Sequence, residues 1–338
     1  MNIRAREGDI IETTDKILFD VKGLAHPPDR IIAFPRFVPD LKADRKRGQV
    51  RYRKIYALSD RYALLKKSFP NYLVYDPVFD EHLCEVPLDA VRRHYRPVDH
   101  LHKLRRSHQV DELEKQAIQL MERLKEASNV SWSHLGLSGS LLVKLHTPTS
   151  DIDPVVYGSK SCCRVYSALK SLLKKGISPL RSYRPNELEK LFDFRSKDTC
   201  TSFEDFVRTE SRKVLQGMFM ERDYFVRFVK GWNEVEEEYG TIRYKSLGYA
   251  KIEAEVVDDS QMIFTPCCYG VDNVKVVEGP RVEPLGEIVS FRGRFCEQAR
   301  NGETVIAQGK IERVQKMSTC EYYRLLLGSR LSDHMILA

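Results

Sequence analysis

The alternation of apolar and polar residues changes character twice along this chain of 338 residues. The first third holds short alternating runs separated by Gly, Pro and Asp, as in small mixed domains. This pattern predicts an N-terminal α+β domain over residues 1–105, with a hairpin over 9–21, strands over 30–38, 50–57 and 72–75, and helices over 59–67 and 87–93. Residues 94–107 are expected to form a charged linker.

Helical and strand periods are mixed in residues 108–267, which we expect to form a central domain. In 110–127 the residues Leu113, Ala117 and Leu124 fall on one face of a helix. The same reasoning predicts helices over 160–175, 185–194 and 202–238, and strands over 130–137, 152–157, 241–244 and 248–257. The fold class is therefore α+β, with a mixed sheet and helices in the centre of the chain.

Residues 268–338 are predicted to form a β-rich C-terminal domain. Asn301-Gly302 lies between strand-like runs over 287–296 and 304–314, which is typical of a hairpin because both turn residues tolerate positive φ. In the first run Arg292 and Arg294 share one face. A small barrel whose basic face guides a polynucleotide fits this pattern, and so does a plain packing module.

Composition narrows the class of protein. The chain has no run of about 18 apolar residues and no signal-peptide pattern, so we expect neither membrane insertion nor secretion. None of the eight cysteines forms a C-x-x-C pair, and we expect them to be buried small residues. These features predict a cytoplasmic protein.

Positive charge is concentrated at the start of the chain. Residues 1–106 carry 22 Lys and Arg against 15 Asp and Glu, whereas residues 107–338 carry 33 of each. Basic runs over 42–54 and 92–106, with tyrosines between the cations, suit the backbone and bases of RNA or DNA. The alternative is a solvated loop and a charged linker. The candidate nucleic-acid-binding residues are Arg45, Lys46, Arg47, Arg51 and Arg53.

Candidate chemistry gathers between residues 135 and 158. Gly139 and Ser140 open a short predicted helix, where free backbone amides attract an anion. Asp151 and Asp153 follow at the start of the next strand, and alternation places both carboxylates on one face. Two carboxylates this close repel each other unless a cation lies between them, so the pair predicts a divalent-metal site beside phosphate oxygens. The alternative is a surface turn with an Asp-capped loop.

The Gly-Ser pair, the ten residues after it and the Asp-Ile-Asp resemble the signature of the DNA polymerase beta-like nucleotidyltransferase superfamily. The wider chain, with VKGLAHPPDRIIAFPRFVP and YLVYDPVFDEHLCEVP upstream, resembles a group of archaeal predicted nucleotidyltransferases. Pro154 departs from the signature, since an apolar strand residue is usual there, and it suggests an edge position or pairing only beyond Val155.

The resemblance implies an enzyme that transfers a nucleoside monophosphate from a nucleoside triphosphate, such as ATP, onto a hydroxyl and releases pyrophosphate. It also implies two Mg²⁺ ions at Asp151 and Asp153, helped by a third carboxylate on a neighbouring strand. Glu253 and Glu255 share one face of a predicted strand, and we favour Glu255, although an aspartate is more usual in the superfamily. Lys144, Arg212 and Lys213 are candidate cations for the triphosphate.

The basic N-terminal domain makes an RNA or DNA end the expected acceptor, while a protein or small-molecule acceptor stays open. A protein of another class fits the same motif. It would keep the nucleotidyltransferase fold without turnover, as a module that binds RNA or a partner protein.

Overall fold

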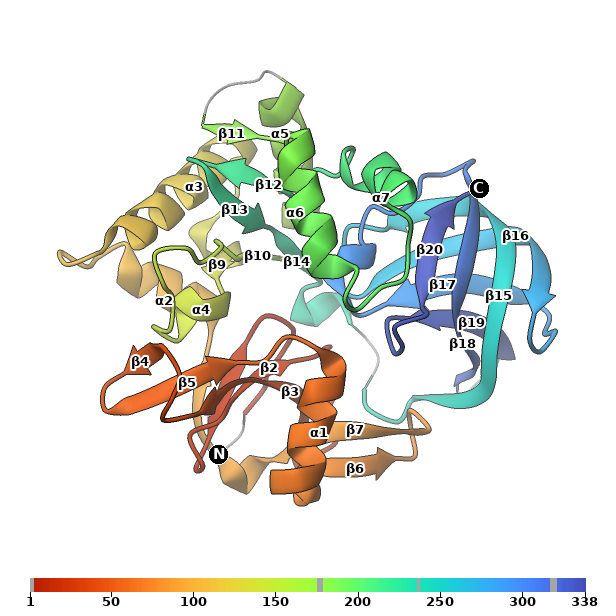
Figure 1. Ribbon diagram of the computed structural model, residues 1–338, viewed down its shortest axis with the longest axis horizontal. Coiled ribbons are helices and arrows are strands. Elements are labelled where there is room, and N and C mark those ends of the chain that lie inside the picture. Colours follow the sequence, from red (N-terminus) through yellow and green to blue (C-terminus); the bar gives the residue numbers. More distant parts are fainter. Residues whose placement is uncertain (1–2, 175–178, 236–237, 317–320) are drawn as a thin grey trace. The chain divides into compact units, whose positions relative to one another are not determined.

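The computed structural model describes residues 3–174, 179–235, 238–316 and 321–338, and the chain divides into two compact units (Figure 1). Unit 1 consists of Met1–Val74, Leu83–Ser182 and Val214–Glu236. Unit 2 consists of Tyr75–His82, Tyr183–Lys213 and Glu237–Ala338. The described residues form a mixed α+β fold with several sheets, in agreement with the predicted class.

The N-terminal part of unit 1 is a sheet of order β4-β5-β3-β2-β1-β8, which β7 and β6 extend from β3. Its strands are β1 (Ile10–Thr13), β2 (Leu18–Val21), β3 (Arg30–Pro39), β4 (Arg45–Arg47), β5 (Val50–Lys54), β6 (Leu73–Asp76), β7 (Glu81–Pro87) and β8 (Val91–Tyr95). β1 and β2 form the predicted hairpin. The helix α1 (Leu58–Ser68) buries Leu65 in a core that contains Ile11 and Phe19.

A second apolar cluster joins this sheet to the segment that follows Gly139. It contains Ile10, Leu18, Phe37 and Tyr52 of the sheet together with Leu142, Val143 and Leu145. Ile10 and Ile11 are adjacent on β1 and belong to different clusters, so the sheet buries both of its faces. The predicted boundary near residue 105 therefore does not separate two cores.

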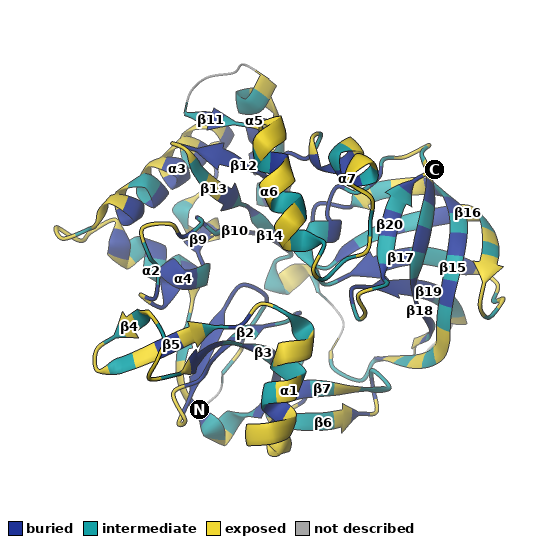
Figure 2. Ribbon diagram, in the orientation of Figure 1, coloured by how far each residue is buried: buried dark blue, intermediate teal, exposed yellow. Residues whose placement is uncertain are grey.

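The layer that carries the Asp pair is the sheet β14-β10-β9, in which β10 is antiparallel to β9 and parallel to β14. Its elements are α2 (Pro97–Leu104), α3 (Glu112–Ser128), β9 (Leu135–Leu137), α4 (Gly139–Leu142), β10 (Pro154–Tyr157), α5 (Ser159–Lys174) and β14 (Arg227–Val229). The helix α3 starts at a capping box of Asp111 and Glu114 and buries its predicted apolar face (Figure 2). Pro154 opens a central strand that meets β14 only from Val155 onward.

The helix predicted over 202–238 is wrong beyond Glu210. The chain forms α7 (Phe203–Glu210) and then β12 (Gln216–Phe219), β13 (Arg222–Phe225) and β14, with β12 and β13 in a small sheet beside β11 (Leu180–Arg181). These strands are only four, four and three residues long and mix apolar with polar residues, so they are too short for periodicity to distinguish a strand from a helix. Met220 and Glu221, with φ of 51° and 59°, form the turn that excludes a helix.

Unit 2 contains α6 (Pro185–Arg195), α7 and a sheet of order β15-β16-β17-β19-β18-β20. Its strands are β15 (Ile242–Gln261), β16 (Cys267–Glu278), β17 (Leu285–Ser290), β18 (Thr304–Lys316), β19 (Glu321–Leu327) and β20 (His334–Leu337). β15 also pairs with β18, so the sheet closes into a barrel. Because β15 completes this barrel, the predicted boundary at residue 267 cuts through it.

The hairpin predicted around Asn301-Gly302 is also wrong. β17 pairs with β16 and β19, whereas β18 pairs with β15, β19 and β20. The Gly302 amide donates to the Val256 carbonyl at 2.8 Å, so the turn brings β18 to β15. Local turn chemistry predicted the turn correctly but not the partner strand.

Two stretches near residue 100 also differ from the prediction. Most of 87–93 is not helical, because the short η2 (Leu88–Ala90) is followed directly by β8. The predicted linker over 94–107 contains α2, which begins at Pro97 and buries Leu101 and Leu104. No helix of the described residues is long and apolar enough to cross a membrane.

Candidate functional site

The Asp pair lies at the start of β10, where neighbouring strands hold the backbone from both sides. Between the two aspartates, Ile152 is fully buried and exchanges backbone hydrogen bonds with β13, from its amide to the Asp223 carbonyl at 2.9 Å and from the Phe225 amide at 3.1 Å. Asp151 and Asp153 are partly exposed. The alternation expected from the sequence therefore places Ile152 in the core and leaves both carboxylates accessible.

The Gly-Ser turn packs directly against the second aspartate. Gly139 has a φ of +63°, and a Cβ at this position would lie 1.9 Å from Asp153 Oδ2. The Ser138 amide donates to the Asp153 carbonyl at 2.9 Å, and Ser138 Oγ donates to the Gly8 carbonyl at 2.6 Å. Only glycine fits here, because the position needs both a left-handed backbone and room for the carboxylate.

The electrostatics of the pair favour a bound cation. Burial and the neighbouring Asp151 raise the pKa of Asp153 to about 7, although Lys54, Arg227 and Arg36 act in the opposite direction. Lys54 Nζ lies 4.0 Å from Asp151 Oδ1, and its side chain is 8% exposed. A divalent ion would offset both the desolvation and the repulsion, which are the two causes that raise this pKa.

The pocket beside the Asp pair is built by two layers of unit 1. The layer of the Asp pair contributes Gly139, Asp153 and Arg227 to its lining. The N-terminal sheet contributes Asp9, Asp20 and Arg36. His94 Nε2 lies 2.8 Å from Asp9 Oδ2, and Arg36 Nε lies 3.5 Å from Asp20 Oδ2. The N-terminal sheet is thus part of the site as well as a candidate surface for nucleic acid.

Of the predicted nucleotide contacts, Gly139 lines this pocket, Ser140 follows it in the chain, and Lys144 is less well placed. Ser140 is buried, and its Oγ has no hydrogen-bond partner among the described residues. Lys144 is exposed, has a φ of 55° and lies beyond the end of α4. Buried polar groups normally have a partner, so the unpartnered hydroxyl of Ser140 distinguishes it from the solvated Lys144.

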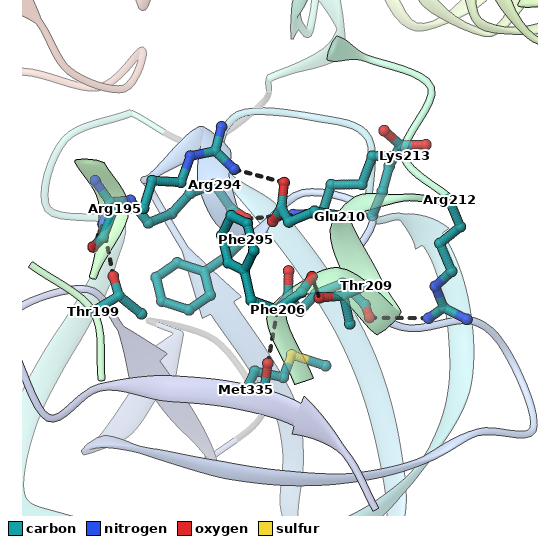
Figure 3. A network of polar contacts seen from close by, with 12 residues as sticks. Arg195, Thr199, Phe206, Thr209, Glu210, Arg212, Lys213, Arg294, Phe295 and Met335 are labelled. Atoms are coloured by element: carbon teal, nitrogen blue, oxygen red, sulfur yellow. Dashed lines mark hydrogen bonds and ion pairs between the residues drawn. The ribbon is translucent and has the colours of Figure 1, made fainter. Parts of the chain in front are cut away.

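Arg212 and Lys213 hold unit 2 together (Figure 3). Arg212 Nη2 donates to Glu303 Oε2 at 2.7 Å, and Lys213 Nζ donates to Glu210 Oε1 at 2.7 Å and to the Arg294 carbonyl at 2.6 Å. Lys213 is 4% exposed. Both cations are engaged by protein groups, because the segment that carries them packs on the barrel.

The expected basic face at Arg292 and Arg294 is occupied in the same way. Both guanidinium groups bind Asp198, with Arg294 Nη2 at 3.1 Å from Asp198 Oδ2. The two arginines therefore anchor the chain before α7 to the barrel of unit 2.

The five predicted nucleic-acid residues divide between the two faces of the β4–β5 hairpin. Arg45 donates to the Leu145 carbonyl, and Arg47 Nη2 donates to Glu12 Oε1 at 2.8 Å, so these two point into unit 1. The other three side chains are exposed on the outer face, and they are Lys46, Arg51 and Arg53. Lys46 lies directly opposite Arg51 in the register. Two like charges in this arrangement destabilise the hairpin unless an anion lies between them.

Glu253 and Glu255 share one face of β15 as predicted, and that strand belongs to unit 2. Glu255 Oε2 accepts a hydrogen bond from Asn273 Nδ2 at 3.0 Å. Glu253 lies 3.9 Å from Lys275 Nζ. A neutral amide leaves Glu255 with its charge unpaired, whereas Lys275 offsets the charge of Glu253.

One further group has the composition of a metal site. Ligand atoms of Asp111, Glu114 and His146 lie within 4.8 Å of one another. Asp111 and Glu114 form the capping box of α3, and His146 Nε2 lies 2.6 Å from Asp111 Oδ2. These contacts already account for the arrangement as the start of a helix.

Comparison with known proteins identifies a relative over nearly the whole chain. No family model matches the chain, and no solved structure is significantly similar to it. An uncharacterized protein of Methanocaldococcus jannaschii, MJ1086, is 32% identical over 345 residues, which cover 97% of this chain and 96% of that protein. The similarity extends over both units, and the chain belongs to the same family as MJ1086.

Proposed function

We propose that the protein is a magnesium-dependent nucleotidyltransferase that moves a nucleoside monophosphate from a nucleoside triphosphate, such as ATP, onto a hydroxyl. One observation carries the proposal: the Asp153 carboxylate lies against Gly139 and beside Asp151, in a pocket that raises its pKa to about 7. The Gly-Ser and Asp-Ile-Asp motif supports the proposal, and so does the order of β9, α4 and β10, which is strand, short helix and strand.

Asp151 and Asp153 would hold Mg²⁺, which when bound activates the attacking hydroxyl and neutralises the triphosphate. Two ions are proposed, with Glu255 in preference to Glu253 as the third carboxylate, because Glu255 lacks a cationic partner among the described residues. Lys54 holds Asp151 in place, and Ile152 fixes the backbone between the two ligands. Gly139 and Ser140 would contact the triphosphate.

The acceptor is proposed to be an RNA or DNA end. Lys46, Arg51 and Arg53 project from the outer face of the β4–β5 hairpin, while Lys54 on its inner face reaches the Asp pair. A polynucleotide bound to the outer face would thereby be held by the same hairpin that touches the metal ligands.

Labelled triphosphates and a mixed RNA pool test the proposal. Asp153→Ala should reduce incorporation by roughly 10²–10³-fold, because the transition state loses charge stabilisation, while the circular dichroism spectrum stays unchanged. Incorporation by a folded variant at the level of the unchanged protein would reject the reaction.

The competing function is a non-catalytic module with the same fold. The specific observation behind it is Arg227, which lies opposite Val155 on the strand next to the Asp pair and places a cation where a further acidic ligand would complete the site. The two functions differ in turnover. A protein that binds nucleotide and RNA but incorporates no label, with any nucleotide or metal offered, would be such a module.

A further inference from the structure

Two guanidinium groups in the pocket lie outside every motif in the sequence. Arg36 of β3 and Arg227 of β14 line the pocket together with Gly139 and Asp153. We infer that Arg36 and Arg227 bind the polyphosphate of the substrate, as an anion subsite that the N-terminal sheet and the layer of the Asp pair build jointly. The inference rests on the proposed function, because it takes a polyphosphate as the ligand of this pocket.

Acidic residues of the protein hold both guanidinium groups in place. Arg227 Nη1 donates to Glu7 Oε1 at 2.6 Å, and the fully buried Glu7 also accepts from Lys22 Nζ at 3.1 Å. Arg36 Nε lies 3.5 Å from Asp20 Oδ2. The orientation of each arginine is therefore fixed before a ligand arrives, which lowers the entropy lost on binding.

Each arginine retains donors for a ligand. A guanidinium has five N–H donors, and the ion pairs with Glu7 and Asp20 use only part of them. Among the described residues, the remaining N–H groups of Arg36 and Arg227 have no further hydrogen-bond acceptor. The side chains are 21% and 25% exposed, so a ligand in the pocket can reach them.

The chemistry of the subsite favours phosphate over other anions. The planar fork of a guanidinium matches two oxygens of a phosphate, and two such forks suit a chain of phosphates better than a single carboxylate. Lys54 lies beside Asp151, and Arg212 and Lys213 are engaged by Glu303 and Glu210 in unit 2. Arg36 and Arg227 are consequently the cations of the pocket with unused donors.

Inorganic tripolyphosphate tests the subsite without requiring turnover. Its affinity for the full chain would be measured by isothermal titration calorimetry, with Mg²⁺ and without it. Arg36→Gln and Arg227→Lys should each weaken binding about tenfold or more, because each removes a charge-assisted fork. Arg227→Lys keeps a cation beside buried Glu7 and so preserves the fold. Arg313→Gln, at an arginine of β18 that pairs with Glu321, is the matched control and should bind as the unchanged protein does.

The outcomes separate the subsite from the reaction. Absence of tripolyphosphate binding, or equal affinity in Arg36→Gln and the unchanged protein, would overturn the subsite. Binding that depends on Arg36 in a protein that transfers no nucleotide would keep the subsite and reject the transferase. Transfer that is insensitive to Arg36→Gln, with an unchanged KM for the triphosphate, would keep the transferase and reject the subsite.

Discussion

Gly139 and Asp153 are in such close contact that a single added methyl group would displace the carboxylate: a Cβ on Gly139 would lie 1.9 Å from Oδ2 and 2.8 Å from Cγ of Asp153. The loop between α4 and β10 separates Gly139 from Asp153 in the sequence, and this contact fixes their positions relative to each other. The glycine of the Gly-Ser pair therefore shapes the surroundings of the Asp153 carboxylate as well as the turn.

The first prediction follows from this contact. Gly139→Ala should reduce Mn²⁺ affinity and nucleotide transfer as strongly as Asp153→Ala, because the carboxylate has to move away from the new methyl group. Gly48→Ala is the control, since Gly48 has a φ of +58° and open space around its Cβ position. Both substitutions should cost about 1–2 kcal/mol of stability from the left-handed backbone. Titration of Mn²⁺ by electron paramagnetic resonance would distinguish them, and equal affinities would contradict the contact.

The second prediction concerns pH. The pKa of Asp153 in the folded chain, about 7, lies above the ordinary value of 3.8, so the folded state binds the proton more tightly. The free energy of unfolding should therefore fall as the pH rises between these two values, and Asp153→Asn should remove that part of the fall. Thermal melts of both proteins at several pH values, without metal, would measure it. Parallel curves would show that Asp153 has an ordinary pKa.

Addition of Mg²⁺ should counteract the fall in the free energy of unfolding with rising pH in the unchanged protein. A metal binds the ionised carboxylates, so the increase in Tm should be larger at about pH 8 than at about pH 5. Asp153→Asn should show little increase at either pH. An increase that is equal at both pH values would place the ion elsewhere.

The third prediction addresses the third carboxylate. Glu255→Gln should lower Mg²⁺-dependent transfer much more than Glu253→Gln, because the charge of Glu253 is already offset by Lys275. Glutamine keeps the size of both side chains, which makes each variant the control for the other. Transfer that is unchanged in both variants would reject both glutamates as metal ligands.

The fourth prediction separates the two faces of the β4–β5 hairpin. Reversing the outward residues Lys46, Arg51 and Arg53 to glutamate should weaken RNA binding and reduce the salt dependence, by roughly 0.7 in log–log slope for each lost contact on a single strand. Fluorescence anisotropy at several salt concentrations would measure it. An unchanged slope would mean that this face is simply solvated.

The inward face should respond in a different way. Arg47→Ala removes the cationic partner of Glu12. Because Glu12 is only 7% exposed, this change should destabilise unit 1 by about 1–3 kcal/mol. Its effect on RNA binding should be small once the protein is folded. Urea unfolding would show the loss, and the outward triple variant should unfold at nearly the same urea concentration as the unchanged protein.

The centre of the site could be predicted from the sequence because its signals are local. Gly139 marks the turn, and alternation around Ile152 places Asp151 and Asp153 on one face. The rest of the pocket depends on pairings between distant segments. Arg36 and Asp153 are more than 100 residues apart, and Arg227 lies in the three-residue strand β14, within the range 202–238 that was predicted as helix. Arg212 and Lys213 are engaged by Glu303 and Glu210, which the sequence could not indicate because a cation beside an apolar run fits a buried ion pair as well as a binding site.

The apolar cluster that joins Tyr52 to Leu142, Val143 and Leu145 makes the β4–β5 hairpin inseparable from the rest of unit 1. A fragment that begins near residue 108 would expose these three side chains and lose the strands that cover them. The β4–β5 hairpin therefore shares a core with the segment that follows Gly139 and is not a detachable module. Under the proposed function, substitutions in this cluster would affect acceptor binding at the hairpin and chemistry at the Asp pair together.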